Sequence, residues 1–294
     1  MGTSNQRCCG ARRLIPRAQI TEWAARAPWP TEADVEQDLI LSRLMVQIAN
    51  DELLRDELAM RGGTCLHKLH LPQPLRYSED LDYVRRTHSG IKPYMAALRK
   101  IAIDVGLVEH SFLQVGQMVH MVFVTESTDG SRRIRIDIEM NVRETEPCFE
   151  RTNRNYKVSS TWWSGEADIP TFQLDELMGT KLRALYQRSK GRDLFDLWHV
   201  LIESEANDER IIQAFNHYMQ GGAFTYSDFA GNLAEKLADR DFAGDLNDLV
   251  TATPAGYELV AAADLVMERL ASRLAHAPGL DAIRDGRWRA STKT

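Results

Sequence analysis

The stretch RYSEDLDYV, residues 76–84, places three acids within four positions and surrounds them with hydrophobic residues. The flanking tyrosines, leucine and valine favour a β-strand. Residues two apart in a strand project to the same face, so Asp80 and Asp82 point the same way. Carboxylates this close repel each other unless solvent separates them or a cation lies between them. The segments before and after this stretch decide which of the two applies.

The composition is that of a soluble globular protein. The chain has 294 residues, of which 44% are hydrophobic and 27% charged, enough for one large domain or two modest ones. Its apolar runs fall short of the ~18 residues of a membrane span, and its basic N-terminus lacks the apolar core of a secretory signal. We therefore expect a cytoplasmic protein with no membrane contact. The net charge of −6 argues against bulk electrostatic binding of nucleic acid but leaves room for a local basic groove.

Cysteine and histidine spacing argues against a zinc site. The cysteines form no CxxC pair; they are Cys8, Cys9, Cys65 and Cys148. His67 and His70 lie in a predicted strand, where residues three apart face opposite sides. We therefore expect no joint metal site from these two histidines.

The pattern along the chain predicts an α+β part followed by helices. Residues 31–59 begin with a capping box and have helical apolar spacing, and Gly62-Gly63 ends this helix. TCLHKLHL, residues 64–71, alternates and is predicted as a strand. Two β-type runs joined by a hairpin signal are predicted over residues 118–127 and 132–142. Helices are predicted over residues 91–107, 174–189 and 192–204, with a short extended piece over 167–173 and mostly helix and loop after 205.

The polar motifs follow one another in an order suited to phosphoryl transfer. Two carboxylates at i and i+2 of a strand can share one or two Mg²⁺ ions, which prefer oxygen ligands. A third carboxylate on a neighbouring strand, Asp137 or Glu139, completes such a site and helps to deprotonate the attacking hydroxyl. Glycines allow backbone N–H groups to approach phosphates, and a lysine offsets triphosphate charge.

Each motif also has a purely structural interpretation. The pair Gly62-Gly63 is a common helix C-cap, and a single helix lysine such as Lys181 is commonly exposed. Asp193 can pair with Arg192 or Arg188 and so hold two helices together.

Taken together, the motifs give the chain a family resemblance. It resembles the AbiEii/AbiGii nucleotidyltransferase toxins, the toxin half of type IV toxin–antitoxin pairs. The resemblance is carried by RGGTCLHK, RYSEDLD, IEMNVRE and KLRALYQRSKGRDLFDL, in this order, and covers roughly residues 40–200.

The resemblance implies a role for each motif residue. The glycine–Ser/Thr–DxD motif falls on Gly63, Thr64, Asp80 and Asp82. The acid of the second motif falls on Glu139, with Asp137 as the alternative acid and a metal ligand beside Asp80 and Asp82. The lysine of the third motif is Lys181, which we expect to face out of the core. The fourth motif falls on Asp196, with Asp193 and Arg192 as secondary candidates. Nucleotide binding is expected from Gly62, Gly63, Thr64, Ser78 and Lys181.

The implied fold is a polymerase-β-like nucleotidyltransferase domain with a helical C-terminal domain. We expect a flexible segment over residues 1–30, the nucleotidyltransferase domain over 31–170, and the helical domain with the lysine and second aspartate motifs over 171–294. The implied activity is Mg²⁺-dependent transfer of a nucleotide from an NTP to RNA, at the 3′ end of tRNA, which blocks translation; a cognate antitoxin is the implied partner.

Two alternatives remain: an AMP-transferase that modifies protein, and a non-catalytic module that binds RNA or a partner on the same fold. The intact acids argue against the second. For an RNA acceptor, the basic residues near the motifs are expected around the same cleft; they are Arg76, Arg85, Arg86, Arg143, Arg188, Lys190 and Arg192.

Overall fold

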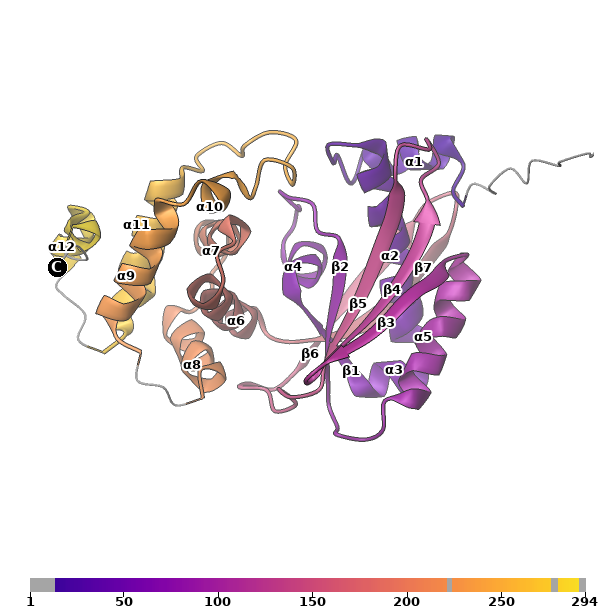
Figure 1. Ribbon diagram of the computed structural model, residues 1–294, viewed down its shortest axis with the longest axis horizontal. Helices are drawn as coiled ribbons and strands as arrows, with labels where there is room; N and C mark the ends of the chain where they lie inside the picture. The colour runs from indigo at the N-terminus through magenta and orange to yellow at the C-terminus, as the bar shows by residue number, and fades with distance from the viewer. Residues whose placement is uncertain (1–13, 221–223, 276–279, 291–294) are drawn as a thin grey trace, which may run out of the picture.

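The computed structural model describes residues 14–220, 224–275 and 280–290. Cys8 and Cys9 lie outside the described residues. The expected α+β architecture is confirmed: a mixed sheet is followed by a group of helices (Figure 1).

The described strands form one seven-stranded sheet in the order β3-β4-β5-β2-β1-β7-β6. They are β1 (Leu58–Arg61), β2 (Asp80–Arg85), β3 (Val108–Val115), β4 (Met118–Glu126), β5 (Arg133–Asn141), β6 (Thr152–Ser159) and β7 (Ser164–Thr171). At the centre, β2 is parallel to β5 and antiparallel to β1. The predicted hairpin is confirmed, since β4 pairs antiparallel with β5. The strand with the paired acids therefore lies in the middle of the sheet.

The helices of the first half pack against the sheet (Figure 1). They are α1 (Arg17–Ala24), α2 (Glu32–Asn50), α3 (Glu52–Glu57) and α5 (Lys92–Val105). The predicted capping box is present, because Thr31 and Asp34 exchange both hydrogen bonds at the start of α2. Buried side chains along nearly all of α2 contact β2, β5, β6 and β7 and form the centre of the core.

The helices of the second half lie together on the other side of β2, with α4 between them and the sheet (Figure 1). They are α6 (Leu174–Gln187), α7 (Gly191–Glu203), α8 (Asp208–Tyr218), α9 (Tyr226–Leu237), α10 (Arg240–Gly244), α11 (Leu259–Arg269) and α12 (Leu280–Arg284). Within the described residues, no helix has the length and apolar character needed to cross a membrane.

Two local expectations were wrong. The helix over residues 31–59 is interrupted at Asp51, which is extended and whose side chain caps α3, and the last residues of that stretch belong to β1. TCLHKLHL is not a strand: α4 (Gly62–Cys65) runs into a π-helical turn over Leu66–His70. Within the segment expected to be flexible, residues 17–24 form α1, which buries Ile20 and Trp23, and residues 1–13 lie outside the described residues.

The two edges of the sheet are β3 and β6, which the sequence patterns did not predict. Every residue of β3 is exposed, including Val108, Phe112, Leu113 and Val115. Both edge strands therefore lack the alternation of buried and exposed positions that reveals a strand in sequence.

Candidate active site

Four carboxylates face one another across the central parallel strands. In the register of β2 and β5, Asp80 pairs with Asp137 and Asp82 pairs with Glu139. Paired residues of adjacent strands project to the same face, so the four side chains lie together. Asp80, Asp82 and Glu139 line a cleft of about 400 Å³ between the sheet and α6. The structure thus brings together the acids of the first and second motifs.

The acids repel one another in this half-buried position. Burial, and next the carboxylate of Asp82, raise the pKa of Asp80 to about 7. Burial also raises the pKa of Asp82, although Arg61 and Lys181 oppose the shift. The pKa of Glu139 is raised by burial and then by Asp82. A cation would relieve this repulsion, and the all-oxygen donors of Asp80 and Asp82 suit Mg²⁺.

The glycines bring the backbone against the acids. Gly62 has φ of +82°, and a Cβ there would lie 1.9 Å from Oδ2 of Asp82. A Cβ on Gly63 would lie 2.6 Å from Nη2 of Arg76 and 2.8 Å from Oγ of Ser78. Both glycines and Ser78 line the cleft. Any side chain at these positions would displace groups of the site.

Thr64 was expected to bind nucleotide, but its side chain lies away from the cleft. Its side chain is fully buried, and its hydroxyl donates a hydrogen bond to the carbonyl oxygen of Asp80 at 2.6 Å. The hydroxyl therefore fixes the start of β2 instead of facing the cleft.

Contrary to expectation, Lys181 does not face out of the core. Its side chain is only 9% exposed, and Nζ lies 3.1 Å from Oδ1 of Asp193 and 2.8 Å from Oδ2 of Asp196. Periodicity along α6 could not reveal these partners because they come from α7. Asp193 also forms the alternative ion pair with Arg188, at 2.7 Å. Burial would raise the pKa of Asp193, but Lys181 and Arg188 outweigh it and lower the pKa.

Asp196 is a buried anchor beneath the cleft. Arg76 donates two hydrogen bonds to its carboxylate, both 2.7 Å, and Nε2 of His67 lies 3.0 Å from Oδ1. Burial opposes ionisation, yet Arg76 and Lys181 hold the pKa of Asp196 well below its usual range. Asp196 thus positions two cations that line the cleft. Arg192 lines it too, and its backbone N–H donates to Asp245.

Sequence reasoning missed a bridge between the sheet and the helices. Glu144 accepts hydrogen bonds from Arg61 at 2.6 Å and from Arg183 on α6 at 2.5 Å. Burial would raise the pKa of Glu144, but the two guanidinium groups lower it to about 2. Glu144 is the last residue of the family motif IEMNVRE, and its place in that motif could have singled it out from the sequence.

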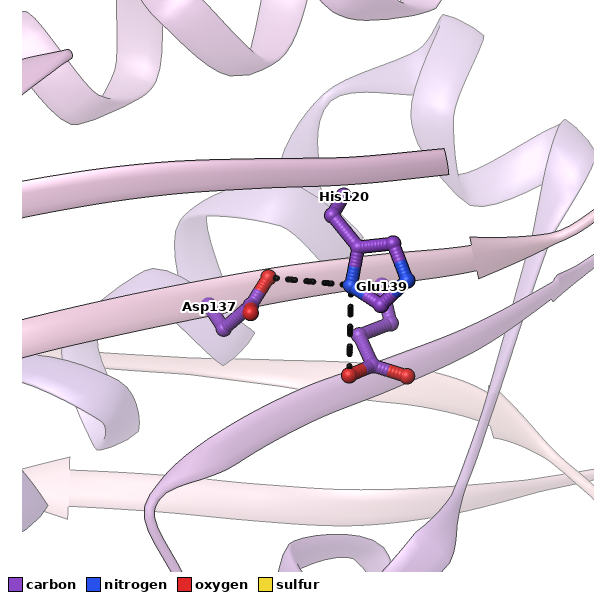
Figure 2. Close-up of side chains that lie close together, drawn as sticks. All are labelled: His120, Asp137 and Glu139. Carbon is purple, nitrogen blue, oxygen red and sulfur yellow. Dashed lines mark ion pairs between the residues drawn. The ribbon is translucent and has the colours of Figure 1, made fainter. Parts of the chain in front are cut away.

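A histidine beside the acids was also missed. His120 on β4 pairs in register with Glu139 on β5, and its Nδ1 lies 3.3 Å from Oε1 of that residue (Figure 2). The β-type run and the hairpin signal predicted β4 but gave no reason to single out this side chain.

Some basic residues expected at the cleft lie elsewhere. Arg85 is buried at the far end of β2 and forms an ion pair with Glu57 at 2.7 Å. Arg86 lines a separate groove, and Arg143 donates to Gln220. The expected residues that do line the cleft are Arg76, Arg188 and Arg192.

The chain is similar to known proteins in sequence and in fold. The family model described as nucleotidyl transferase AbiEii toxin, type IV TA system, matches residues 43–276. Among solved structures, the chain is similar to MenT4, a nucleotidyltransferase toxin from Mycobacterium tuberculosis H37Rv, with 15% identity, a TM-score of 0.59, and coverage of 95% of this chain and 100% of that one. It is also similar to JHP933 from Helicobacter pylori, with 17% identity, a TM-score of 0.47, and coverage of 89% and 96%. No curated protein matches the chain. At these identities the likeness to MenT4 shows a shared fold.

Proposed function

Because the chain belongs to the AbiEii family of nucleotidyltransferase toxins of type IV toxin–antitoxin systems, we propose that it transfers a nucleotide from an NTP to RNA. The acceptor we propose is the 3′ end of tRNA, whose modification blocks translation in the cytoplasm. A cognate antitoxin is the proposed partner. The observation that carries the proposal is the register of β2 and β5, which sets Asp80 beside Asp137 and Asp82 beside Glu139. Asp80, Asp82 and Glu139 line the cleft.

In the proposed reaction, an acceptor hydroxyl attacks the α-phosphorus in line. A new O–P bond forms, the α–β phosphoanhydride bond breaks, and pyrophosphate leaves. Glu139, or alternatively Asp137, helps to remove the proton of the hydroxyl. Asp80 and Asp82 would hold Mg²⁺, which offsets negative charge on the triphosphate when it is bound.

The cationic side of the cleft suits the triphosphate. Arg188 and Arg192 keep part of their side chains exposed to solvent, at 51% and 28%. Lys181 faces the cleft from its ion pairs, and Asp196 holds it there. Gly63 and Ser78 line the same cleft, and we propose that the backbone N–H of Gly63 and the hydroxyl of Ser78 donate to phosphate oxygens. Lys181, Gly63 and Ser78 would offset charge that develops on the leaving pyrophosphate, and the more exposed Arg188 and Arg192 remain available to the acceptor.

An RNA acceptor is compatible with the acidic chain. The positive charge near the acids is local, and we propose that Arg188 and Arg192 contact RNA phosphates at the rim. Each such contact adds roughly one unit to the slope of log affinity against log salt. Binding should therefore be salt-sensitive in spite of the net charge of −6.

The test is incubation with each α-labelled NTP, Mg²⁺, and either total RNA or total protein. We expect one NTP to label RNA of tRNA size, and Asp80→Asn or Asp82→Asn to lower the rate about a thousandfold. Asp168→Asn, an exposed acid on β7, is the matched control and should keep the wild-type rate. Label found only in protein would support an AMP-transferase instead. A folded protein that labels neither fraction would support a non-catalytic binding module.

A further inference from the structure

The imidazole of His120 forms a cluster with Asp137 and Glu139 (Figure 2), and Glu139 of this cluster lines the cleft. Nδ1 of His120 lies 3.3 Å from Oε1 of Glu139 and 3.6 Å from Oδ1 of Asp137. One potential ligand atom from each residue lies within 4.8 Å of the other two. Two adjacent strands of the rigid central sheet, β4 and β5, position all three side chains.

These separations suit ligands of one metal ion. Ligand atoms about 2.1 Å from an ion and at right angles to each other are about 3 Å apart, and wider angles give larger separations. The two distances to Nδ1 therefore require little movement to admit an ion. The cluster is also only partly exposed, with 26% of His120, 13% of Asp137 and 25% of Glu139 accessible.

One oxygen of the cluster has an ion-pair neighbour in His120 but no hydrogen bond from the described residues. Oδ1 of Asp137 is buried and accepts no hydrogen bond from the described residues, whereas Oδ2 accepts one from Arg135 at 3.3 Å. A buried polar atom without a hydrogen bond is destabilising. A cation from solution would satisfy this oxygen.

The imidazole nitrogen of His120 affects which cation the cluster can bind. Mg²⁺ prefers six oxygen ligands, whereas imidazole suits first-row transition metals. We propose that His120, Asp137 and Glu139 bind a first-row transition-metal dication, with Nδ1 of His120 as a direct ligand. This deepens the proposed function, because it assigns a metal class to the acids that face Asp80 and Asp82.

The alternative is that His120 only forms ion pairs with the two acids. The two interpretations predict opposite effects of removing the imidazole. A ligand that is lost weakens metal binding. An ion pair that is lost frees two carboxylates and leaves metal binding equal or tighter.

The experiment uses Mn²⁺ as the probe on the full chain without nucleotide. Electron paramagnetic resonance of free Mn²⁺ measures binding, and pulsed spectra of the bound ion detect coupling to ¹⁴N. We expect wild-type protein to show ¹⁴N coupling, and His120→Ala and His120→Asn to lose it and bind Mn²⁺ at least tenfold more weakly. A tenfold excess of Mg²⁺ over Mn²⁺ should not displace the bound Mn²⁺. His110→Ala, an exposed histidine on β3, should behave as wild type.

Unchanged or tighter Mn²⁺ binding by the folded His120 variants would overturn the proposal. Bound Mn²⁺ without ¹⁴N coupling in the wild-type protein would do so as well, even if both variants fail to fold. Labelling of RNA separates this result from the proposed function. If RNA is labelled and His120→Ala binds Mn²⁺ normally, only the metal assignment fails. If no macromolecule is labelled and the ¹⁴N coupling depends on His120, only the proposed function fails.

Discussion

At Gly62 the absence of a side chain decides where the carboxylate of Asp82 can lie. We expect Gly62→Ala to displace Asp82, because the new Cβ would lie 1.9 Å from its Oδ2, and the positive φ of +82° adds backbone strain of about 1 kcal/mol or more. Labelling should fall at least a hundredfold at a temperature where the variant remains folded. The measurement is the initial labelling rate, with thermal unfolding followed in parallel.

Gly130→Ala is the matched control for this substitution. Gly130 also has positive φ, +71°, but a Cβ there meets nothing within 4 Å. It should lower stability by a similar backbone amount and leave the labelling rate unchanged. Equal loss of labelling in both variants would show that backbone strain, not displacement of Asp82, is responsible.

Lys181 should affect stability as well as activity. Lys181→Ala leaves Asp193 and Asp196 with fewer cations in a buried position, which should cost about 3 kcal/mol. We expect a lower melting temperature together with slower labelling. Lys100→Ala, an exposed lysine in α5, should change neither. A wild-type melting temperature for Lys181→Ala would contradict the ion pairs that the structure gives this lysine.

At the scale of elements, residue type and helical spacing predicted the elements with a marked pattern. Strand-forming residues predicted β2, β4 and β5, with a hairpin signal between the last two, and helical patterns predicted α5, α6 and α7. β3 is exposed on both faces and β6 is mostly polar, so neither has a buried face to mark it. The four residues of β1 continue the apolar pattern of the preceding helices.

The segment over residues 64–71 was wrongly predicted as a strand because its apolar residues alternate along the sequence. Cys65 and Leu66 are both fully buried, and adjacent buried positions suit a helix better than a strand. The π-helical turn closes with a hydrogen bond from the backbone N–H of Leu71 to the carbonyl of Leu66, a five-residue spacing that alternation does not describe. The acids of the site were predicted because strand spacing determines their direction. The partners of Lys181 were not, because they depend on how two helices pack.

The π-helical turn should make the fold sensitive to acid. Burial lowers the pKa of His67 to about 4, although Asp196 opposes the shift. The folded state therefore favours neutral His67. The fold has its full stability above pH 6.5, where the histidine is neutral in both states, and loses stability as the pH falls towards 4. The loss should reach about 3 kcal/mol. Between pH 6.5 and 4, the free energy of unfolding of His67→Gln should therefore fall by about 3 kcal/mol less than that of the wild type. The amide at position 67 can still donate a hydrogen bond to Asp196.

Denaturant unfolding at pH 8, 6.5 and 4 measures this difference. At pH 8 the histidine is neutral in both states, so the comparison there reports packing alone. A gap between wild type and His67→Gln that stays constant from pH 8 to 4 would refute the buried neutral histidine.

At the scale of the whole molecule, Glu144 joins the sheet to the helices. It bridges Arg61, which pairs in register with Asp82, and Arg183 on α6. We expect Glu144→Gln to lower the free energy of unfolding by about 2 kcal/mol at pH 7, because two guanidinium groups lose their partner. Labelling should fall as well, because Arg61 is then free to move beside Asp82.

Asp175→Asn is the control for loss of an ion pair. Asp175 pairs with Arg210 at 2.6 Å between α6 and α8, within the helical half. It should lower stability without changing the labelling rate of folded protein. If both variants changed the labelling rate equally, the Glu144 bridge would have no effect on activity beyond that of an ordinary ion pair.

The paired strands and the buried anchor also determine when a newly made chain becomes active. Asp82 leaves the ribosome early, its neighbour Glu139 follows much later, and Asp196, which holds Arg76 and Lys181, comes last. At roughly 5–20 residues per second, synthesis from Asp82 to Asp196 takes on the order of ten seconds. Throughout that interval the nascent chain has its first acids but no assembled cleft. A protein proposed to stop translation would thus be inert towards the ribosome that is making it.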